Sequence, residues 1–297
     1  MQASINVGQR KTAAFGLRCL VAMIVCGALS GAFADSPTSP IRLVDAHTAG
    51  LIPSGSYQIE SRLYPSGSAR NGAGLLVGIS VGITDRFNLG LGYGGEGIVG
   101  RGRNAEFNPF PGCMVKYRLF DENFFLPGIA VGFDYQGYGG IAKESTIGYS
   151  GYLYKSQGFF LAFSKSYLFA KVIQLGLHGD VSLSMEDIDH VTWPDAVTGL
   201  DIGITEMVSF VAEYDWGLTT KDPTAVEPDP PYARPQDGYL HAGVRLSLTP
   251  GFAVELDARD ITENRSIATP TENGTIATHK IGWSREIKVV YTSQIKR

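Results

Sequence analysis

The feature that most constrains this chain is a series of strand-like segments separated by gaps that are alternately long and very short. In each segment apolar residues alternate with small or charged ones, which is the period of a β-strand with two different faces. A soluble sandwich shares that period, but nothing in it requires every second connection to be minimal. A barrel that spans an outer membrane does require it, because its periplasmic turns are short and its outward loops are long. We therefore predict an all-β fold, a transmembrane antiparallel up-and-down β-barrel of about 12 strands.

The alternation gives the expected strands directly. They span 56–64, 74–84, 87–95, 112–120, 125–136, 151–164, 171–183, 197–205, 207–217, 238–248, 251–259 and 280–291. Minimal turns fall at 85–86, 121–123, 206–207 and 249–251, with a slightly longer one at 165–170. The long connections are 65–73, 96–111, 137–150, 184–196, 218–237 and 260–279. If the first strand starts in the periplasm, both termini and every short turn are periplasmic.

The two faces of each expected strand specify its register. In the second strand one face is apolar and the other is small, with Gly78 and Gly82 on the small side. In the segment 251–259 the apolar residues oppose a charged face that includes Glu255 and Arg259. A shift by one residue would turn these charges toward lipid. The alternative, a pair of soluble sandwiches with the apolar faces turned inward, leaves the gap pattern unexplained.

The N-terminus has the features of a secretory signal peptide. A positive region that ends at Arg18 precedes the apolar run 19–29, and residues 32–34 supply a small-x-small cleavage site. We expect residues 1–34 to be removed. A lipoprotein signal at Cys26 is the weaker alternative, because a large residue precedes that cysteine. The apolar run is too short for a good membrane-spanning helix.

The rest of the chain is mildly acidic and keeps one cysteine. The net charge of the full sequence is −4, and the expected signal peptide holds basic residues but no acid. Cys113 has no cysteine partner after the signal peptide, so an internal disulfide is excluded. Acidity without a basic stripe argues against nucleic acid as a partner. We expect a periplasmic leader or possible plug segment at 35–55, the barrel at 56–291 and a periplasmic C-terminal tail at 292–297.

The face expected to line the lumen is rich in charge. The predicted charged network comprises Glu60, Arg62, Lys116, Arg118, Asp134, Glu213, Asp215, His241, Arg245, Glu255, Asp257 and Arg259, and the same face carries His178, Asp180, Asp201, Glu286 and Lys288. Neighbouring strands bring acids beside bases. Glu213 and Asp215 are expected within reach of Arg245, which is also within reach of Glu255 or Asp257.

Two interpretations of this lumen are open. In the first, mutually neutralising pairs fill the interior, because buried charges must be paired. In the second, rings of charge line a passive channel for small polar or charged solutes. The glycine-rich wall from Gly78 to Gly94 leaves room on one side, unless residues 35–55 or a loop fill that space.

The sequence gives little support for catalysis or metal binding. His178 and Asp180 share a face with Ser182, but such a row arises from alternation alone. The histidines are scattered and Cys113 has no ligand partner nearby. We predict no enzymatic activity, no cofactor and no metal. An outer-membrane lipid hydrolase is kept as a remote alternative because the location permits it.

Aromatic residues gather near both ends of the expected strands, as in membrane-interface belts. The periplasmic rim is expected to hold Phe120, Phe124, Phe125, Tyr167, Phe169, Phe252 and Tyr291, and the outer rim Tyr64, Tyr93, Tyr135, Tyr138, Tyr152, Trp216 and Tyr239. Ordinary strand-end and core positions are the alternative for any single ring.

Several stretches resemble the YjbH-like group of bacterial outer-membrane β-barrels, which is linked by association to exopolysaccharide production. They are VKYRLFDENFFLPGIAVGFDYQGYGG (115–140), YKSQGFFLAFSKSY (154–167), LGLHGDVSLS (175–184), VAEYDWGL (211–218), YLHAGVRLSL (239–248) and REIKVVY (285–291). The resemblance covers most of the chain after the signal peptide, and it implies a barrel with an envelope role and offers no catalytic residues. The chain departs from the usual barrel end, because it continues beyond Tyr291.

The expected location is the bacterial outer membrane. The expected partners are outer-membrane lipid and lipopolysaccharide, the barrel assembly machinery during insertion, and polysaccharide export components. The acidic outer loops at 184–196 and 218–237 are either plain solvated loops or bridges to lipopolysaccharide through divalent cations.

Overall fold

The computed structural model describes residues 40–65, 72–100, 105–142, 151–169, 173–186, 194–218, 238–264, 266–270, 276–280 and 282–295. The expected signal peptide and most of the two acidic loops lie outside these residues. Within the described part, no helix is long and apolar enough to cross a membrane.

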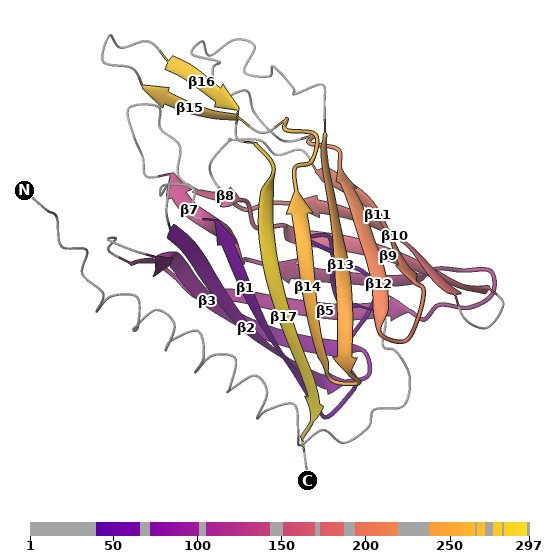
Figure 1. Ribbon diagram of the computed structural model, residues 1–297. Helices are drawn as coiled ribbons and strands as arrows, with labels where there is room; N and C mark the ends of the chain where they lie inside the picture. Colours follow the sequence, from indigo (N-terminus) through magenta and orange to yellow (C-terminus); the bar gives the residue numbers. More distant parts are fainter. Residues whose placement is uncertain are drawn as a thin grey trace, which may run out of the picture.

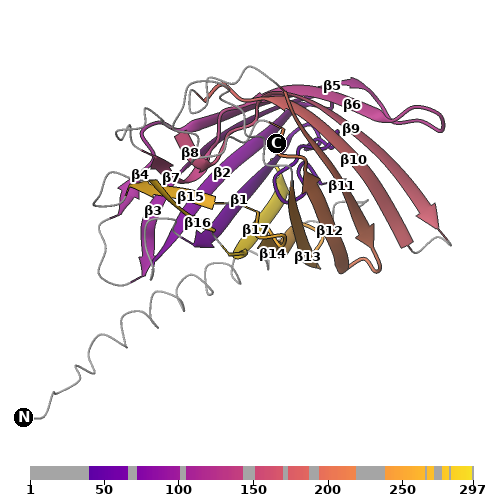
Figure 2. The ribbon, with the colours of Figure 1, turned by 90° about the horizontal axis from the view of Figure 1, so that it is seen from above.

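The strands form one closed antiparallel barrel of 12 strands (Figures 1 and 2). They are β1 (Ser56–Pro65), β2 (Gly72–Thr84), β3 (Phe87–Gly100), β5 (Gly112–Phe120), β6 (Gly128–Asp134), β9 (Gly158–Phe169), β10 (Ile173–Leu183), β11 (Asp195–Gly203), β12 (Val208–Asp215), β13 (Tyr239–Thr249), β14 (Phe252–Arg259) and β17 (Ser284–Gln294). Each pairs with the next along the chain, and β1 closes the ring by pairing with β17 from Ser56↔Gln294 to Leu63↔Ile287. The predicted up-and-down barrel is confirmed.

Several strand boundaries and one gap length differ from the sequence-based expectation. The strand expected at 151–164 runs instead over 158–169, so the turn expected at 165–170 is displaced to the gap between Phe169 and Ile173. The last strand continues past Tyr291 to Gln294, because its end pairs with the start of β1. The alternation of gap lengths is also not strict, since the connection 121–127 is no shorter than the connection 66–71.

Burial in the barrel is inverted relative to a water-soluble protein. On the outer wall, Ile79, Leu91 and Leu256 expose 46%, 61% and 50% of their surface. Toward the interior, Glu255 and Lys288 expose 0% and 1%. In a wall that is apolar outside and charged inside, pairing between strands satisfies the backbone hydrogen bonds. The apolar outer face is then available to lipid. The register predicted from the two faces is therefore confirmed.

Residues 40–55, called the lumen segment below, lie inside the barrel. The side chains of Leu43, Val44 and Thr48 are fully buried at 0% exposure. Arg42 forms an antiparallel bridge with His47, so the chain turns back on itself between them, and Leu43 N donates to Ala46 O over 2.9 Å. The segment is thus a compact re-entrant turn that then leads directly into β1.

Two short hairpins and one edge strand are not members of the 12-strand ring. β7 (Tyr138–Ala142) pairs with β8 (Gly151–Tyr154), and β15 (Ser266–Pro270) pairs with β16 (Ile276–Lys280). β4 (Glu106–Phe107) pairs with β3. All of them belong to the long connections, and we call that side of the barrel the loop end and the opposite side the turn end. The β7–β8 hairpin buries Tyr138 and Tyr154 in a cluster with Tyr64 and Leu76.

The aromatic belts are present, but some of their expected members are not in them. At the turn end, Phe124 and Phe125 are 87% and 85% exposed. Tyr64 and Tyr138, expected in the outer belt, are buried at 1% and 5%, as are Tyr239 and Phe252 at 3% and 7%. These residues fall on inward positions or, in the case of Tyr138, on a hairpin that folds inward, so position along the strand alone does not decide their environment.

Candidate functional site

The charged residues predicted to line the lumen do point inward, but with unequal exposure. Eight of the predicted residues are buried, namely Arg62, Lys116, Asp134, Glu213, His241, Glu255, Asp257 and Arg259. Four keep partial exposure, namely Glu60, Arg118, Asp215 and Arg245. The structure joins many of them in ion pairs, and the lumen segment supplies backbone and side-chain partners for several of the rest.

One cluster forms across three neighbouring strands. Glu255 lies directly opposite Arg245 on one side and Lys288 on the other. Its carboxylate accepts from Arg245 Nε and Lys288 Nζ, each over 2.5 Å, and Lys288 Nζ also lies 3.6 Å from Asp257. The expected pairing of Arg245 with Glu255 is therefore present. The expected approach of Glu213 to Arg245 is not, since Glu213 faces the lumen segment instead.

A second cluster surrounds Asp45 at the inner end of the lumen segment. Arg62 Nη1 and Arg259 Nη1 donate to Asp45 Oδ1 over 2.9 and 3.1 Å, and Arg259 Nη2 donates to Oδ2. The Tyr138 hydroxyl donates to the same Oδ1 over 2.9 Å. Burial opposes ionisation of Asp45, but Arg259 and then Arg62 hold the pKa of this carboxyl well below its usual value. Asp45 is therefore a carboxylate bound by side chains from β1, β14 and β7.

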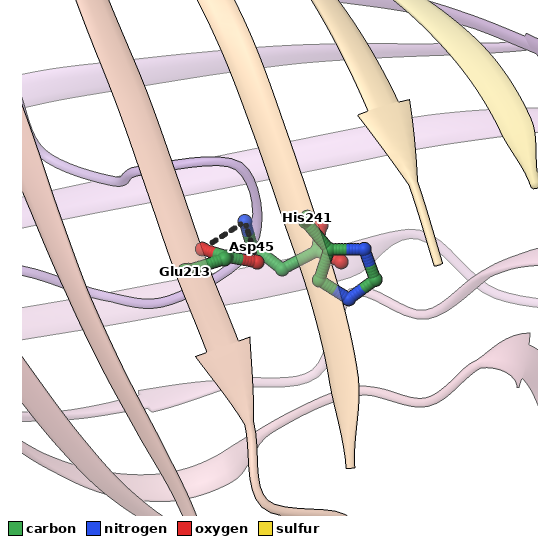
Figure 3. A group of neighbouring side chains, drawn as sticks. All are labelled: Asp45, Glu213 and His241. Atoms are coloured by element: carbon green, nitrogen blue, oxygen red, sulfur yellow. Dashed lines mark hydrogen bonds between the residues drawn. The ribbon is translucent and has the colours of Figure 1, made fainter. Parts of the chain in front are cut away.

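Asp45 also forms a group with Glu213 of β12 and His241 of β13, shown in Figure 3, with ligand-type atoms within 4.8 Å of one another. The donor set does not fit a divalent cation. The Glu213 carboxylate already accepts the N–H groups of Asp45 and Ala46, each over 3.0 Å. His241 Nδ1 accepts the N–H of Asp260 over 2.9 Å, so the unprotonated nitrogen of the neutral ring is in use.

Further along the lumen segment, His47 is fixed from three directions. Its ring stacks on Phe160 with centroids 3.8 Å apart, its Nε2 lies 3.0 Å from Asp134 Oδ2, and its N–H donates to Asp180 Oδ2 over 3.0 Å. Burial first, and the nearby Arg42 second, lower the pKa of His47 to about 3. The ring is therefore neutral at physiological pH, and Arg42, which pairs with Asp134, carries the positive charge.

Toward the turn end, backbone groups of the lumen segment are bound by side chains of the wall. Ile52 N donates to Asn88 Oδ1 over 2.8 Å, and Asn88 Nδ2 donates back to Ile52 O over 2.9 Å. Arg118 Nη2 donates to Ala49 O over 2.9 Å. Peptide groups inside a barrel that are not paired within a strand ladder require such partners, because an unpaired buried N–H or C=O is costly.

Ala49 N also contacts a serine–histidine–aspartate chain across β9, β10 and β11. It donates to Ser164 Oγ over 2.7 Å, Ser164 Oγ lies 2.8 Å from His178 Nδ1, and His178 Nε2 lies 2.6 Å from Asp201 Oδ1. The hydrogen-bonded serine is therefore Ser164, not the Ser182 that shares the face of His178. Because the Ala49 N–H donates to the Ser164 hydroxyl, this serine–histidine–aspartate chain binds the lumen segment.

The sequence did not predict that Asp45, His47 and Tyr138 make contacts inside the lumen. One signal was present for the first two. The stretch 41–52 (IRLVDAHTAGLI) is markedly apolar after the Pro- and Ser-rich residues before it, which a solvated leader does not require. Tyr138 gave no comparable signal, because its position depends on an inward fold of a long connection.

The strand pairing and the inverted burial define the class of protein: a closed transmembrane β-barrel of the outer-membrane type. No family model and no curated protein matches the chain. It is similar in structure to Omp33 of Acinetobacter baumannii (TM-score 0.40, 8% identity, 82% of this chain and 100% of that chain) and to the NanC porin (0.37, 9%, 80% and 98%). A mutant of TodX, a monoaromatic hydrocarbon channel, gives 0.36 and 9% over 82% and 91%. Values this low assign no function.

Proposed function

We propose that this chain is a non-enzymatic outer-membrane component whose barrel is held closed by the lumen segment, and that it accompanies the export of extracellular polysaccharide. The observation that supports the closed barrel is the binding of Asp45 by Arg62, Arg259 and Tyr138, which come from three separate elements. The polysaccharide role is supported by the resemblance of the chain to the YjbH-like group.

The proposal includes an orientation and partners. The turn end and both termini face the periplasm, and the long loops face outward, in keeping with the short connections of the turn end. Lipid and lipopolysaccharide surround the barrel, the barrel assembly machinery inserts it, and polysaccharide export components act beside it. A closed lumen supports an accessory role, because a polymer requires a continuous wide path.

The polysaccharide role is tested in the producing cell. Deletion of the gene is expected to reduce secreted polysaccharide, and re-expression of the wild-type chain is expected to restore it. A control strain that loses an unrelated outer-membrane barrel separates this effect from general envelope damage. Unchanged secretion in the deletion strain, with the barrel shown to be absent, would refute the role and leave the closed barrel intact.

A passive channel for small polar solutes is the second candidate, because the lumen is not completely filled. A cavity of about 50 Å³ remains between Arg42 and the wall formed by β1, β2, β3 and β5. Liposome swelling with small solutes tests it. Uptake that changes its charge preference in Arg245→Ala or Asp257→Ala supports a channel, and an absence of uptake with correctly folded protein excludes one.

A further inference from the structure

The cavity beside the lumen segment has an unusual wall. Four inward-facing glycines form one side of it, Gly78, Gly90, Gly92 and Gly112, which we call the glycine wall. On the opposite side lie Ile41 and Arg42 of the lumen segment. Arg42 and Glu60, whose side chains are 17% and 20% exposed, also line the cavity, so it reaches solvent.

The glycines of this wall differ in what lies against them. A Cβ atom at Gly92 or Gly112 would stand 2.4 or 2.2 Å from Gln136 Oε1, so these two positions make room for the Gln136 amide. A Cβ atom at Gly78 would meet only ordinary contacts, the nearest being Leu91 O at 3.6 Å. A Cβ atom at Gly78 is therefore accommodated without a backbone clash, on a residue that lines the cavity.

Three polar atoms of the cavity-lining residues are buried and have no hydrogen-bond partner among the described residues. They are Arg62 Nη2, Gln58 Oε1 and Gln136 Oε1, one donor and two acceptors. Arg62 is 1% exposed, and its other nitrogens are bound by Glu60 and Asp45. A buried polar group without a partner is unfavourable, so the three atoms favour an occupant that supplies hydrogen bonds.

The charges of the cavity are already balanced. Arg42 pairs with Asp134, and Arg62 Nε donates to Glu60 over 2.7 Å. An occupant with a net charge would disturb these pairs, whereas a neutral one would not. Leu76 and Met114 add apolar surface on the same wall. The cavity therefore suits a molecule that combines neutral polar groups with C–H surface.

We propose that this cavity binds a small neutral polyhydroxylated molecule of about the size of glycerol. A hydroxyl group both donates and accepts, so one ligand can donate to the two glutamine oxygens and accept from Arg62 Nη2. The C–H groups of the ligand lie against Gly78 and Leu76. A single water needs roughly 10–15 Å³, so the present cavity holds several atoms. The site requires neither conduction nor polysaccharide export, and it goes beyond the proposed function.

The test is ligand-observed saturation-transfer NMR on the refolded, detergent-solubilised chain, with glycerol as the probe. Wild type is expected to give a saturable signal. Gly78→Val fills the cavity, and Gln58→Leu removes a hydrogen-bond acceptor. Each is expected to weaken ligand binding by about ten-fold or more, because the ligand loses its space in the first variant and one hydrogen bond in the second. Gly179→Val is the matched control, a strand glycine that has nothing within 4 Å of its Cβ position and lies away from the cavity.

Folding is monitored by the heat-sensitive mobility of the barrel in detergent gels. Gln58→Leu is expected to leave the unfolding temperature unchanged or raised, because Gln58 Oε1 has no partner among the described residues. This separates a binding role from a structural one. Equal signals from all four folded proteins would place glycerol elsewhere, and no saturable signal in wild type would mean that the cavity holds water only. Either result overturns the proposal.

Discussion

The Tyr138 hydroxyl lies 2.9 Å from Asp45 Oδ1 and joins the two segments that fold into the barrel from opposite ends. Tyr138 belongs to a hairpin of the loop end, and Asp45 to the lumen segment, which enters from the turn end. Arg259 supports both, since it pairs with Asp45 and lies with its guanidinium carbon 4.0 Å from the ring centroid of Tyr154. The proposed closure of the lumen therefore depends on a small group of contacts around Asp45.

Asp45→Asn tests the strength of those contacts. The substitution removes the carboxylate that Arg62 and Arg259 share, although Arg62 keeps Glu60 and both keep Glu286. Breaking a fully buried pair costs about 3–5 kcal/mol. The Asp45 side chain keeps 29% exposure, so solvent screening reduces the expected loss in the free energy of unfolding to about 2 kcal/mol. Urea unfolding of the vesicle-inserted barrel measures it.

The control is Asp121→Asn, which removes a carboxylate from the exposed pair with Arg86, where both side chains are more than half exposed. A surface pair contributes about 0–1 kcal/mol, so this variant is expected to stay close to wild type. Equal losses in the two variants would show that the Asp45 pairs have no special weight.

The buried His47 ring is expected to make the barrel less stable in acid. Its folded pKa, about 3, is below the ordinary value of 6.5, so the unfolded chain takes up a proton first as the pH falls. The contribution of His47 to the free energy of unfolding is complete above about pH 6.5. Below that pH it falls by about 1.4 kcal/mol per pH unit, down to about pH 3. Wild type is therefore expected to lose about 2 kcal/mol more than His47→Gln between pH 7 and pH 5. Parallel stability curves for the two proteins would contradict the buried neutral ring.

Leu91→Arg tests the membrane-facing wall. In water, an arginine at a position that is 61% exposed would be tolerated. Facing lipid near the centre of a strand, it is expected to destabilise the inserted barrel by about 2–4 kcal/mol. Phe125→Arg, at an exposed position of the turn end, is expected to cost about 0–1 kcal/mol because it reaches the interface. Equal costs in equilibrium refolding into vesicles would argue against this placement of the wall.

Ser164→Ala tests the serine–histidine–aspartate chain. We expect the wild-type barrel to show no phospholipid turnover and the variant to lose about 1–3 kcal/mol of stability, because Ala49 N and His178 lose a buried partner. Ser182→Ala is the matched comparison on the same inner wall. Phospholipid hydrolysis by wild type that Ser164→Ala abolishes would establish a hydrolase and refute the non-enzymatic proposal.

Much of the barrel could be predicted because lipid on one side and charge on the other fix the register of each strand. Glu255 and Lys288 could be assigned to the lumen for this reason, since a one-residue shift would expose both to lipid. The partners of individual charges could not be predicted in the same way. Glu213 binds backbone N–H groups of the lumen segment instead of Arg245, and this depends on a fold of residues 40–55 that no strand period encodes.

The strand expected at 151–164 shows a related limit. Gly151–Tyr154 does form a strand, but it pairs with β7 in a separate hairpin, and the barrel strand starts only at Gly158. Gly158 has a positive φ of 66°, which breaks the extended run between them. Alternation alone does not reveal such an interruption.

The claim that the lumen segment closes the barrel is tested most directly by single-channel recording in planar bilayers. The chain from residue 35, here called the mature chain, and a version of it without residues 40–55 are refolded and checked for heat-sensitive gel mobility. We expect no steady conductance from the mature chain and a steady, ohmic conductance from the deletion. The same steady conductance from both proteins would show that the lumen segment does not close the barrel, and the same absence of conductance from both would show that the charged wall is sealed without it.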